Sequence, residues 1–150
     1  MNRSRRNPPW TLARRAALAA LALATACSTV PTSPGGVAAN VGGTWHYLAA
    51  SAASPTVDGT LALTAGSGSG FTGSLDATEA SALGQRLPLT GLVSGRASDA
   101  TSIEFDIVIG SARLRHHVAT VRADSITGTW IETGDSGAGA SGSFRAGRIS

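Results

Sequence analysis

The sequence predicts an all-β fold, a small antiparallel up-and-down β-barrel of about eight strands over residues 42–150. Three observations predict it. Apolar and polar residues alternate with a period of two in several stretches, as they do in strands with one buried face. Turn-forming residues divide the region at short intervals, which is typical of sandwiches and barrels. A triplet of glycine, hydroxyl residue and large apolar residue recurs along the region.

The alternation is clearest in one stretch, where Ile103, Phe105, Ile107 and Ile109 fall on one face and Glu104 and Asp106 on the other. No comparable helical pattern is found after the first thirty residues, although residues 76–83 are the best candidate for a single helical turn in a loop. Between the turns we expect eight strands, near 43–50, 57–65, 71–77, 86–95, 101–110, 112–123, 126–133 and 140–148.

The recurring triplet favours a barrel over a flat sandwich. With a period of two, its glycine and its large residue point to the same face. An inward glycine leaves space for a neighbour's ring and lets a strand bend, which a small barrel needs in order to close. The copies are Gly43-Thr44-Trp45, Gly59-Thr60-Leu61, Gly73-Ser74-Leu75, Gly128-Thr129-Trp130 and Gly142-Ser143-Phe144.

Gly43-Thr44-Trp45 resembles the G-x-W signature of the calycins, the superfamily of lipocalin-like and avidin-like barrels. The resemblance implies that a basic side chain near the last strand covers the tryptophan. Arg148 fits that role better than Arg145, because it shares the inward parity of Phe144. A calycin-like barrel also implies a small apolar ligand, for which the candidate pocket lining is Trp45, Tyr47, Phe105 and Trp130. These aromatic residues could equally fill the core.

The first 26 residues are typical of an export signal. Five arginines precede an apolar run over residues 16–26, and this run ends in small residues directly before Cys27. The run has 11 residues, whereas a helix needs about 20 to cross the hydrocarbon core. We therefore expect residues 1–26 to be a cleaved signal peptide and not a membrane span.

Cys27 is the only cysteine, and it directly follows Ala24-Thr25-Ala26. The arrangement resembles the lipobox of bacterial lipoproteins, which implies that Cys27 carries palmitate-type acyl chains and anchors the chain to a membrane. The same triplet also fits the A-x-A site of ordinary signal cleavage, so both modes of cleavage stay open. Ser28 differs from the Asp that resembles an inner-membrane retention signal. In a Gram-negative source, the outer membrane is therefore favoured.

Residues 27–41 then form the lipidated cysteine and a tether rich in Pro, Gly, Ser and Thr. Removal of the signal peptide also changes the charge. From residue 28 onward seven arginines face nine Asp and Glu, so the mature charge is about −2. The basicity of the whole chain belongs to its first residues and gives no argument for a nucleic-acid partner.

The chain shows no recognisable catalytic or metal-binding pattern, and we expect no enzymatic activity, cofactor or metal. His46 is expected to point outward, and His116 and His117 to point to opposite faces. Arg113, Arg115 and His117 share one face, which could bind an anion but more simply indicates a solvated barrel exterior. The carboxylates Glu104, Asp106 and Glu132 are likewise expected on outer faces.

Two hypotheses for function follow. In the first, the protein is a membrane-anchored lipoprotein of the cell envelope whose calycin-like barrel binds a small apolar ligand. In the second, it is a structural or assembly protein of the envelope that binds another protein through the barrel exterior. An exposed apolar patch would favour the second hypothesis.

Overall fold

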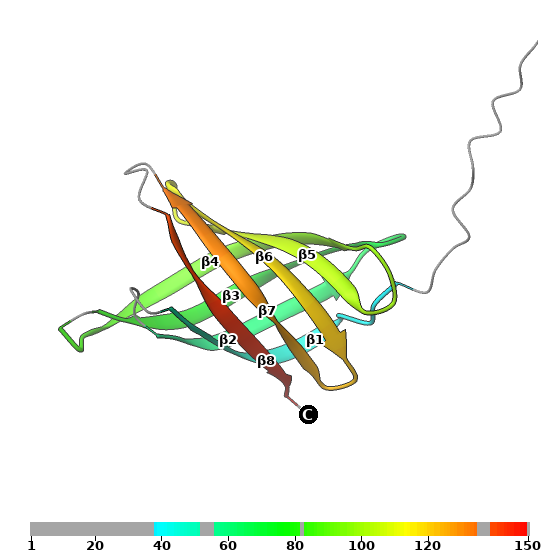
Figure 1. The fold of residues 1–150 in the computed structure, drawn as a ribbon, viewed down its shortest axis with the longest axis horizontal. Helices are drawn as coiled ribbons and strands as arrows, with labels where there is room; N and C mark the ends of the chain where they lie inside the picture. The colour runs from blue at the N-terminus through cyan, green and yellow to red at the C-terminus, as the bar shows by residue number, and fades with distance from the viewer. Residues whose placement is uncertain (1–37, 52–55, 82, 135–138, 150) are drawn as a thin grey trace, which may run out of the picture. The chain divides into compact units, whose positions relative to one another are not determined.

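The computed structural model describes residues 38–51, 56–81, 83–134 and 139–149, and within them the only regular elements are eight strands (Figure 1). The strands are β1 (Gly43–Ala50), β2 (Val57–Ala65), β3 (Gly70–Ala80), β4 (Arg86–Ala97), β5 (Ser102–Ile109), β6 (Arg113–Arg122), β7 (Ser125–Gly134) and β8 (Ala140–Arg148). The prediction of eight strands is confirmed, with most boundaries displaced by at most two residues.

Each strand pairs antiparallel with its neighbour in the sequence, and β8 pairs back onto β1 to close the barrel. The closing register sets Trp45 opposite Arg148 and Ala49 opposite Phe144. An up-and-down barrel of this kind leaves no long unpaired edge. The predicted fold class is therefore confirmed.

One predicted loop is wrong. The sequence predicts a turn that begins at Thr78, with residues 76–83 as a candidate helical turn. Instead β3 continues to Ala80 and pairs with β4 as far as Arg86. The pairing of β3 with β4 continues to Ala80 because β4 begins early enough, at Arg86, to pair with these last residues of β3. Backbone groups that are paired in this way favour an extended strand over a turn.

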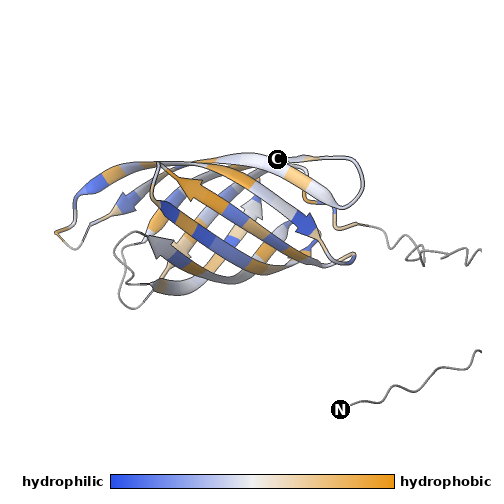
Figure 2. Ribbon diagram, turned by 90° about the horizontal axis from the view of Figure 1, so that it is seen from above, coloured by the Kyte–Doolittle hydropathy of each residue, from blue (hydrophilic) through white to orange (hydrophobic). Residues whose placement is uncertain are grey.

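Buried and more exposed residues alternate along the strands, for example in β1, β5 and β6. The hydropathy along the ribbon is banded in the same way (Figure 2). The core is formed by the inward residues, among which the largest fully buried apolar side chains are Trp45, Trp130, Tyr47, Phe105, Leu61, Leu75, Ile103, Ile107 and Ile126. The outward positions are mostly hydroxyl or charged residues. The period-two pattern of the sequence thus maps directly onto the inside and outside of the barrel.

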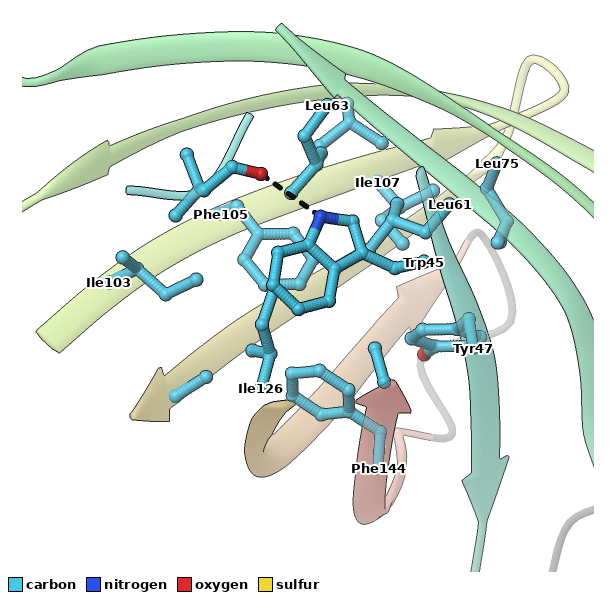
Figure 3. Close-up of a cluster of buried hydrophobic side chains, with 14 of the residues drawn as sticks. Trp45, Tyr47, Leu61, Leu63, Leu75, Ile103, Phe105, Ile107, Ile126 and Phe144 are labelled. Atoms are coloured by element: carbon cyan, nitrogen blue, oxygen red, sulfur yellow. Dashed lines mark hydrogen bonds between the residues drawn. The ribbon is translucent and has the colours of Figure 1, made fainter. Parts of the chain in front are cut away.

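We call the barrel end formed by residues 38–42 and by the loops after β2, β4 and β6 the base. Trp45 is fully buried there, and its indole Nε1 donates a hydrogen bond to the Val41 carbonyl at 3.0 Å (Figure 3). The Arg148 guanidinium lies over the Trp45 ring, 4.2 Å from its centroid. The Arg148 Nη1 also donates to the Gly42 carbonyl at 2.7 Å, which fixes the guanidinium in place.

The tether predicted over residues 27–41 is too long at its C-terminal end. Ala39 and Val41 are buried in the core, and the Ala39 backbone N donates to the Asp99 carbonyl at 3.2 Å. Composition alone could not predict that Ala39 and Val41 are buried. Isolated Ala and Val residues in a segment rich in Pro, Gly and Ser are also common in flexible spacers, and their burial depends on contact with the barrel core. The rest of the predicted tether and the signal peptide lie outside the described residues.

The inward glycines allow close approach of neighbouring strands, and Gly128 provides a test. A Cβ atom at Gly128 would overlap the Val118 carbonyl oxygen and the Ala119 backbone, which cannot move aside as a flexible side chain could. We expect Gly128→Ala to lower the free energy of unfolding by about 1–3 kcal/mol. Gly147→Ala is the control, since a Cβ there meets nothing within 4 Å, and it should stay within about 0.5 kcal/mol of the wild type. Urea unfolding followed by tryptophan fluorescence measures both. Equal stabilities of the two variants would contradict the close-approach role.

Candidate functional site

We call the opposite end of the barrel, where strands β1, β3, β5 and β7 end, the mouth. All four predicted lining residues lie inside the barrel and are buried. They do not form one pocket wall. Trp45 lies at the base under Arg148, Tyr47 and Phe105 share a ring cluster, and Trp130 lies under Arg115. The base half of the interior is therefore apolar, whereas the mouth half combines buried apolar residues with charged ones.

Four rings meet in the middle of the barrel around His117. Its imidazole stacks on Phe105 with ring centroids 4.4 Å apart and planes 6° from parallel. Phe144 meets the same imidazole edge-on at 4.9 Å and stacks on Tyr47 at 5.5 Å. Figure 3 shows Tyr47, Phe105 and Phe144 projecting into the interior. Contacts of this geometry add stabilisation beyond the buried area alone.

Hydrogen bonds fix the tautomer of the buried imidazole. The His117 Nδ1 lies 3.1 Å from the Arg115 carbonyl oxygen, which can only accept, so Nδ1 carries the proton. In a neutral ring Nε2 is then the acceptor, and the Tyr47 hydroxyl, 2.9 Å away, donates to it.

Burial keeps both groups neutral. Desolvation lowers the pKa of His117 to about 3, and the positive charge of Arg115 acts in the same direction. Desolvation also raises the pKa of Tyr47 to about 12, against the opposing charge of Arg115. Neither group changes charge near neutral pH, so this pair supplies fixed hydrogen-bonding groups and not an acid–base couple.

Because the pKa of His117 is lowered in the folded state, the free energy of unfolding depends on pH in the acidic range. Below the unfolded pKa near 6.5 the unfolded chain binds a proton that the folded chain does not bind until about pH 3. The free energy of unfolding should therefore fall by about 1.5 kcal/mol between pH 6.5 and 5, before carboxylates titrate. Urea unfolding at several pH values measures the slope. His117→Gln should remove it, whereas His116→Gln, on the outer face, should keep it. A slope unchanged in His117→Gln would contradict this assignment.

Four charged side chains form the mouth cluster: Glu79, Arg113, Arg115 and Glu132. Glu132 accepts from Arg113 Nε at 3.0 Å and from Arg115 Nε at 2.8 Å, while Glu79 accepts from both guanidinium groups at 3.1–3.2 Å. Although burial opposes it, these hydrogen bonds lower the pKa of Glu132, so the carboxylate stays ionised. Two positive and two negative charges give the cluster no net charge.

Exposure falls steeply from the rim inward. The side chain of Arg113 is 35% exposed, those of Glu79 and Glu132 are 15% and 16%, and that of Arg115 is 1%. The Arg115 guanidinium also lies over the Trp130 ring, 4.4 Å from its centroid. Its Nη1 is buried and has no hydrogen-bond partner among the described residues. Solvent therefore reaches the cluster from the mouth, with a buried unpaired donor beneath.

The predicted solvated exterior for Arg113, Arg115 and His117 is wrong, and so is the outer position of Glu132. Strand β6 has mixed polarity on both faces, so its own pattern did not fix its orientation. Two signals could have done so. Glu132 follows inward Trp130 by two residues, and His117 shares the parity of Ala119 and Val121. Opposite charges on facing strands then compensate one another inside the barrel.

The exterior predictions for other polar residues agree with the structure. His46 and His116 point outward and pair with Asp58 at 2.8 Å and Asp106 at 2.7 Å. Glu104 pairs with Arg96 on the outer face at 3.2 Å. Among the described residues, no group of three or more His, Cys, Asp or Glu side chains is placed to hold a metal ion. The same residues contain no helix long and apolar enough to cross a membrane. Cys27 lies outside the described residues.

Comparisons with known proteins bear on the fold alone. No protein-family model and no curated protein matches the sequence. Solved structures of designed barrels do match. The barrel EF1p2_mFAP2b, bound to DFHBI, has a TM-score of 0.58 at 16% identity and covers 72% of this chain and 93% of that chain.

Two further barrels match at the same level. A de novo designed fluorescence-activating β-barrel has a TM-score of 0.55 at 17% identity over 72% of this chain and 93% of that chain. The redesigned barrel mFAP1, bound to DFHBI, has a TM-score of 0.54 at 16% identity over 71% of this chain and 94% of that chain. The shared feature is the fold. It is the closed antiparallel barrel of eight strands that the sequence predicts.

Proposed function

We propose that the protein is a membrane-anchored envelope barrel that binds a small, mainly apolar ligand in its mouth half, without catalysis. One observation carries the proposal. Three buried polar side chains, Tyr47, Arg115 and His117, converge inside an aromatic interior below a rim that solvent reaches. A few convergent polar groups within a concave apolar interior are the usual features of a small-molecule site.

Two further features support a ligand here. The inward residues Ala49 and Ala77 are small, which limits the side-chain volume that fills this half of the barrel. The similar designed barrels include two whose structures are described as bound to DFHBI, so the same fold accommodates a small molecule in those proteins. By contrast, the base is held by Trp45, Arg148 and Val41, which favours the mouth as the entrance.

Native mass spectrometry of the full chain purified from its source tests this proposal. We expect a non-covalent small molecule to accompany the protein, and Trp130→Ala to lose it. Leu92→Ala, on the outer face and 73% exposed, is the control that should retain it. A protein that carries no small molecule and binds none from a lipid extract of the same cells would contradict the proposal.

The anchor is a separate part of the proposal. Support comes from the only cysteine lying at the predicted cut, after a basic segment and an 11-residue apolar run. Two or three acyl chains, at about 0.8 kcal/mol per buried methylene, would hold such a protein to a bilayer. The proposed location is the cell envelope, with the outer membrane favoured in a Gram-negative source.

Cys27→Ala with membrane fractionation tests the anchor. We expect the wild type in the membrane fraction and the variant in the soluble fraction of the envelope. Ser28→Ala is the matched control and should fractionate as the wild type does. A Cys27→Ala variant that stays with the membrane would exclude lipidation at Cys27 while leaving ligand binding untouched.

The second candidate function, binding of an envelope protein through the exterior, is favoured by one observation. Leu92, Val108 and Leu114 pair directly across β4, β5 and β6 and are 73%, 45% and 40% exposed. Two hollows of about 380 and 410 Å³ flank Val108 on this face. Contiguous exposed apolar residues often mark a protein interface. A stable protein partner lost on Val108→Asp, together with an empty barrel, would favour this function over the first.

A further inference from the structure

The Arg115 guanidinium is buried inside the barrel, and its Nη1 donates no hydrogen bond to any described residue. Its Nε donates to Glu132, and its Nη2 lies within 3.2 Å of Glu79 and 2.6 Å of Glu132. Nη1, by contrast, is buried without a partner among the described residues. A buried donor left unpaired costs free energy, more for a charged group, so native proteins rarely leave one.

The charges around Nη1 restrict what could pair with it. Arg113 and Arg115 are already balanced by Glu79 and Glu132, and both carboxylates accept from both guanidinium groups. An added buried anion would lack a counter-charge, which is costly in a site of low dielectric. An uncharged acceptor oxygen satisfies Nη1 without disturbing this balance.

The surroundings restrict the rest of the molecule. Trp130 covers the guanidinium, and Tyr47, Phe105 and Phe144 surround His117 deeper in the barrel. A group that pairs with Nη1 therefore lies beside the Trp130 ring, with the ring cluster around His117 deeper in the barrel. The bulk of the molecule must be apolar to gain from contact with these rings.

We propose that the ligand of this barrel is a small apolar molecule bearing an uncharged carbonyl oxygen, which accepts hydrogen bonds from Arg115 Nη1. The inference rests on the proposed function and deepens it, because it assigns the polar group of the ligand and the residue that selects it. Arg115 then acts as the specificity-determining residue, and Glu79 and Glu132 position it.

Two probes that differ by one oxygen test the inference: 1-indanone and indane. We expect the full chain to bind indanone at least about tenfold more tightly than indane, the ratio expected for a hydrogen bond to a charged donor. Arg115→Lys keeps the charge but loses the forked donors, and it should reduce the ratio to about one. Arg96→Lys is the matched control on the outer face, where the side chain is 73% exposed, and it should keep the ratio.

A measurement on the unmodified chain guards against a variant that fails to fold. In nitrogen-15 NMR spectra of the wild type, indanone should shift the Arg115 guanidinium signals, whereas indane should not. Indane-1-carboxylate, the anionic probe, should bind more weakly than indanone.

The outcomes separate the two proposals. Equal binding of indanone and indane, with no shift at Arg115, would overturn the carbonyl inference, leave small-molecule binding intact and indicate that Nη1 is satisfied by water only. Tighter binding of the carboxylate would replace the carbonyl by an anion and overturn the inference too. Binding of neither neutral probe would overturn this inference, whereas the proposed function itself is judged by the co-purifying molecule.

Discussion

Replacing Glu132 by Gln is expected to lower the free energy of unfolding by about 3 kcal/mol. Glu132 accepts hydrogen bonds from Arg113 and Arg115, and the Arg115 side chain is only 1% exposed. The amide of Gln has nearly the same shape, but it removes the negative charge and turns a donor toward the guanidinium groups. The loss is large because the buried cation remains after one of its two counter-charges has gone.

Glu104→Gln is the matched control, because Glu104 pairs with Arg96 on the outer face and its side chain is 42% exposed. Exposed pairs contribute about 1 kcal/mol or less, so this variant should unfold close to the wild type. Urea unfolding near neutral pH compares the two. Similar decreases in the free energy of unfolding for both variants would mean that the mouth cluster is hydrated like a surface ion pair. Such a result would contradict a structural role for the cluster.

Replacing Trp45 by Ala is expected to lower the free energy of unfolding by about 3–5 kcal/mol. The indole is fully buried and donates a hydrogen bond to the Val41 carbonyl. The Arg148 guanidinium lies over its ring. Its removal leaves a cavity at the base and frees residues 38–42 and Arg148 from their shared contact. Trp130, which is buried in the barrel, still reports unfolding by fluorescence.

Leu92→Ala controls for the loss of a large apolar residue, since Leu92 is 73% exposed on the outer face. It should change the free energy of unfolding by about 0.5 kcal/mol or less. Amide hydrogen exchange of Ala39, whose N–H donates to the Asp99 carbonyl, should also speed up in Trp45→Ala. Unchanged protection there would show that the N-terminal segment is held independently of the tryptophan.

The strand pattern was predictable because it is local. The alternation in β5 and the glycine triplets in β1, β7 and β8 predict which large residues face inward. In the structure, all of these large residues are buried inside the barrel. The contact between Arg148 and Trp45 follows from the same parity, once β1 and β8 are neighbours. Barrel closure was predictable because inward glycines and large residues alternate along the chain.

The polar interior was not predictable in the same way. Arg113, Arg115 and Glu132 look like ordinary solvated residues on half-wet strands, and nothing in β6 alone fixes which face is buried. Glu79 lies in a segment whose composition predicted a turn. Each charge can be buried only because a counter-charge from another strand meets it. Arg115 lies opposite Glu132 in the register of β6 and β7, whereas Glu79 reaches both arginines from β3, which is not adjacent to β6.

The sequence by itself determined the number and order of strands, the inward residues of most of them and the arginine over Trp45, because period, parity and turn chemistry act between near neighbours. Only the tertiary structure decided that residues 38–41 pack on the barrel and that four charges and a histidine lie inside it. Burial of a polar group is settled by its partners, and those partners come from strands far apart in the chain.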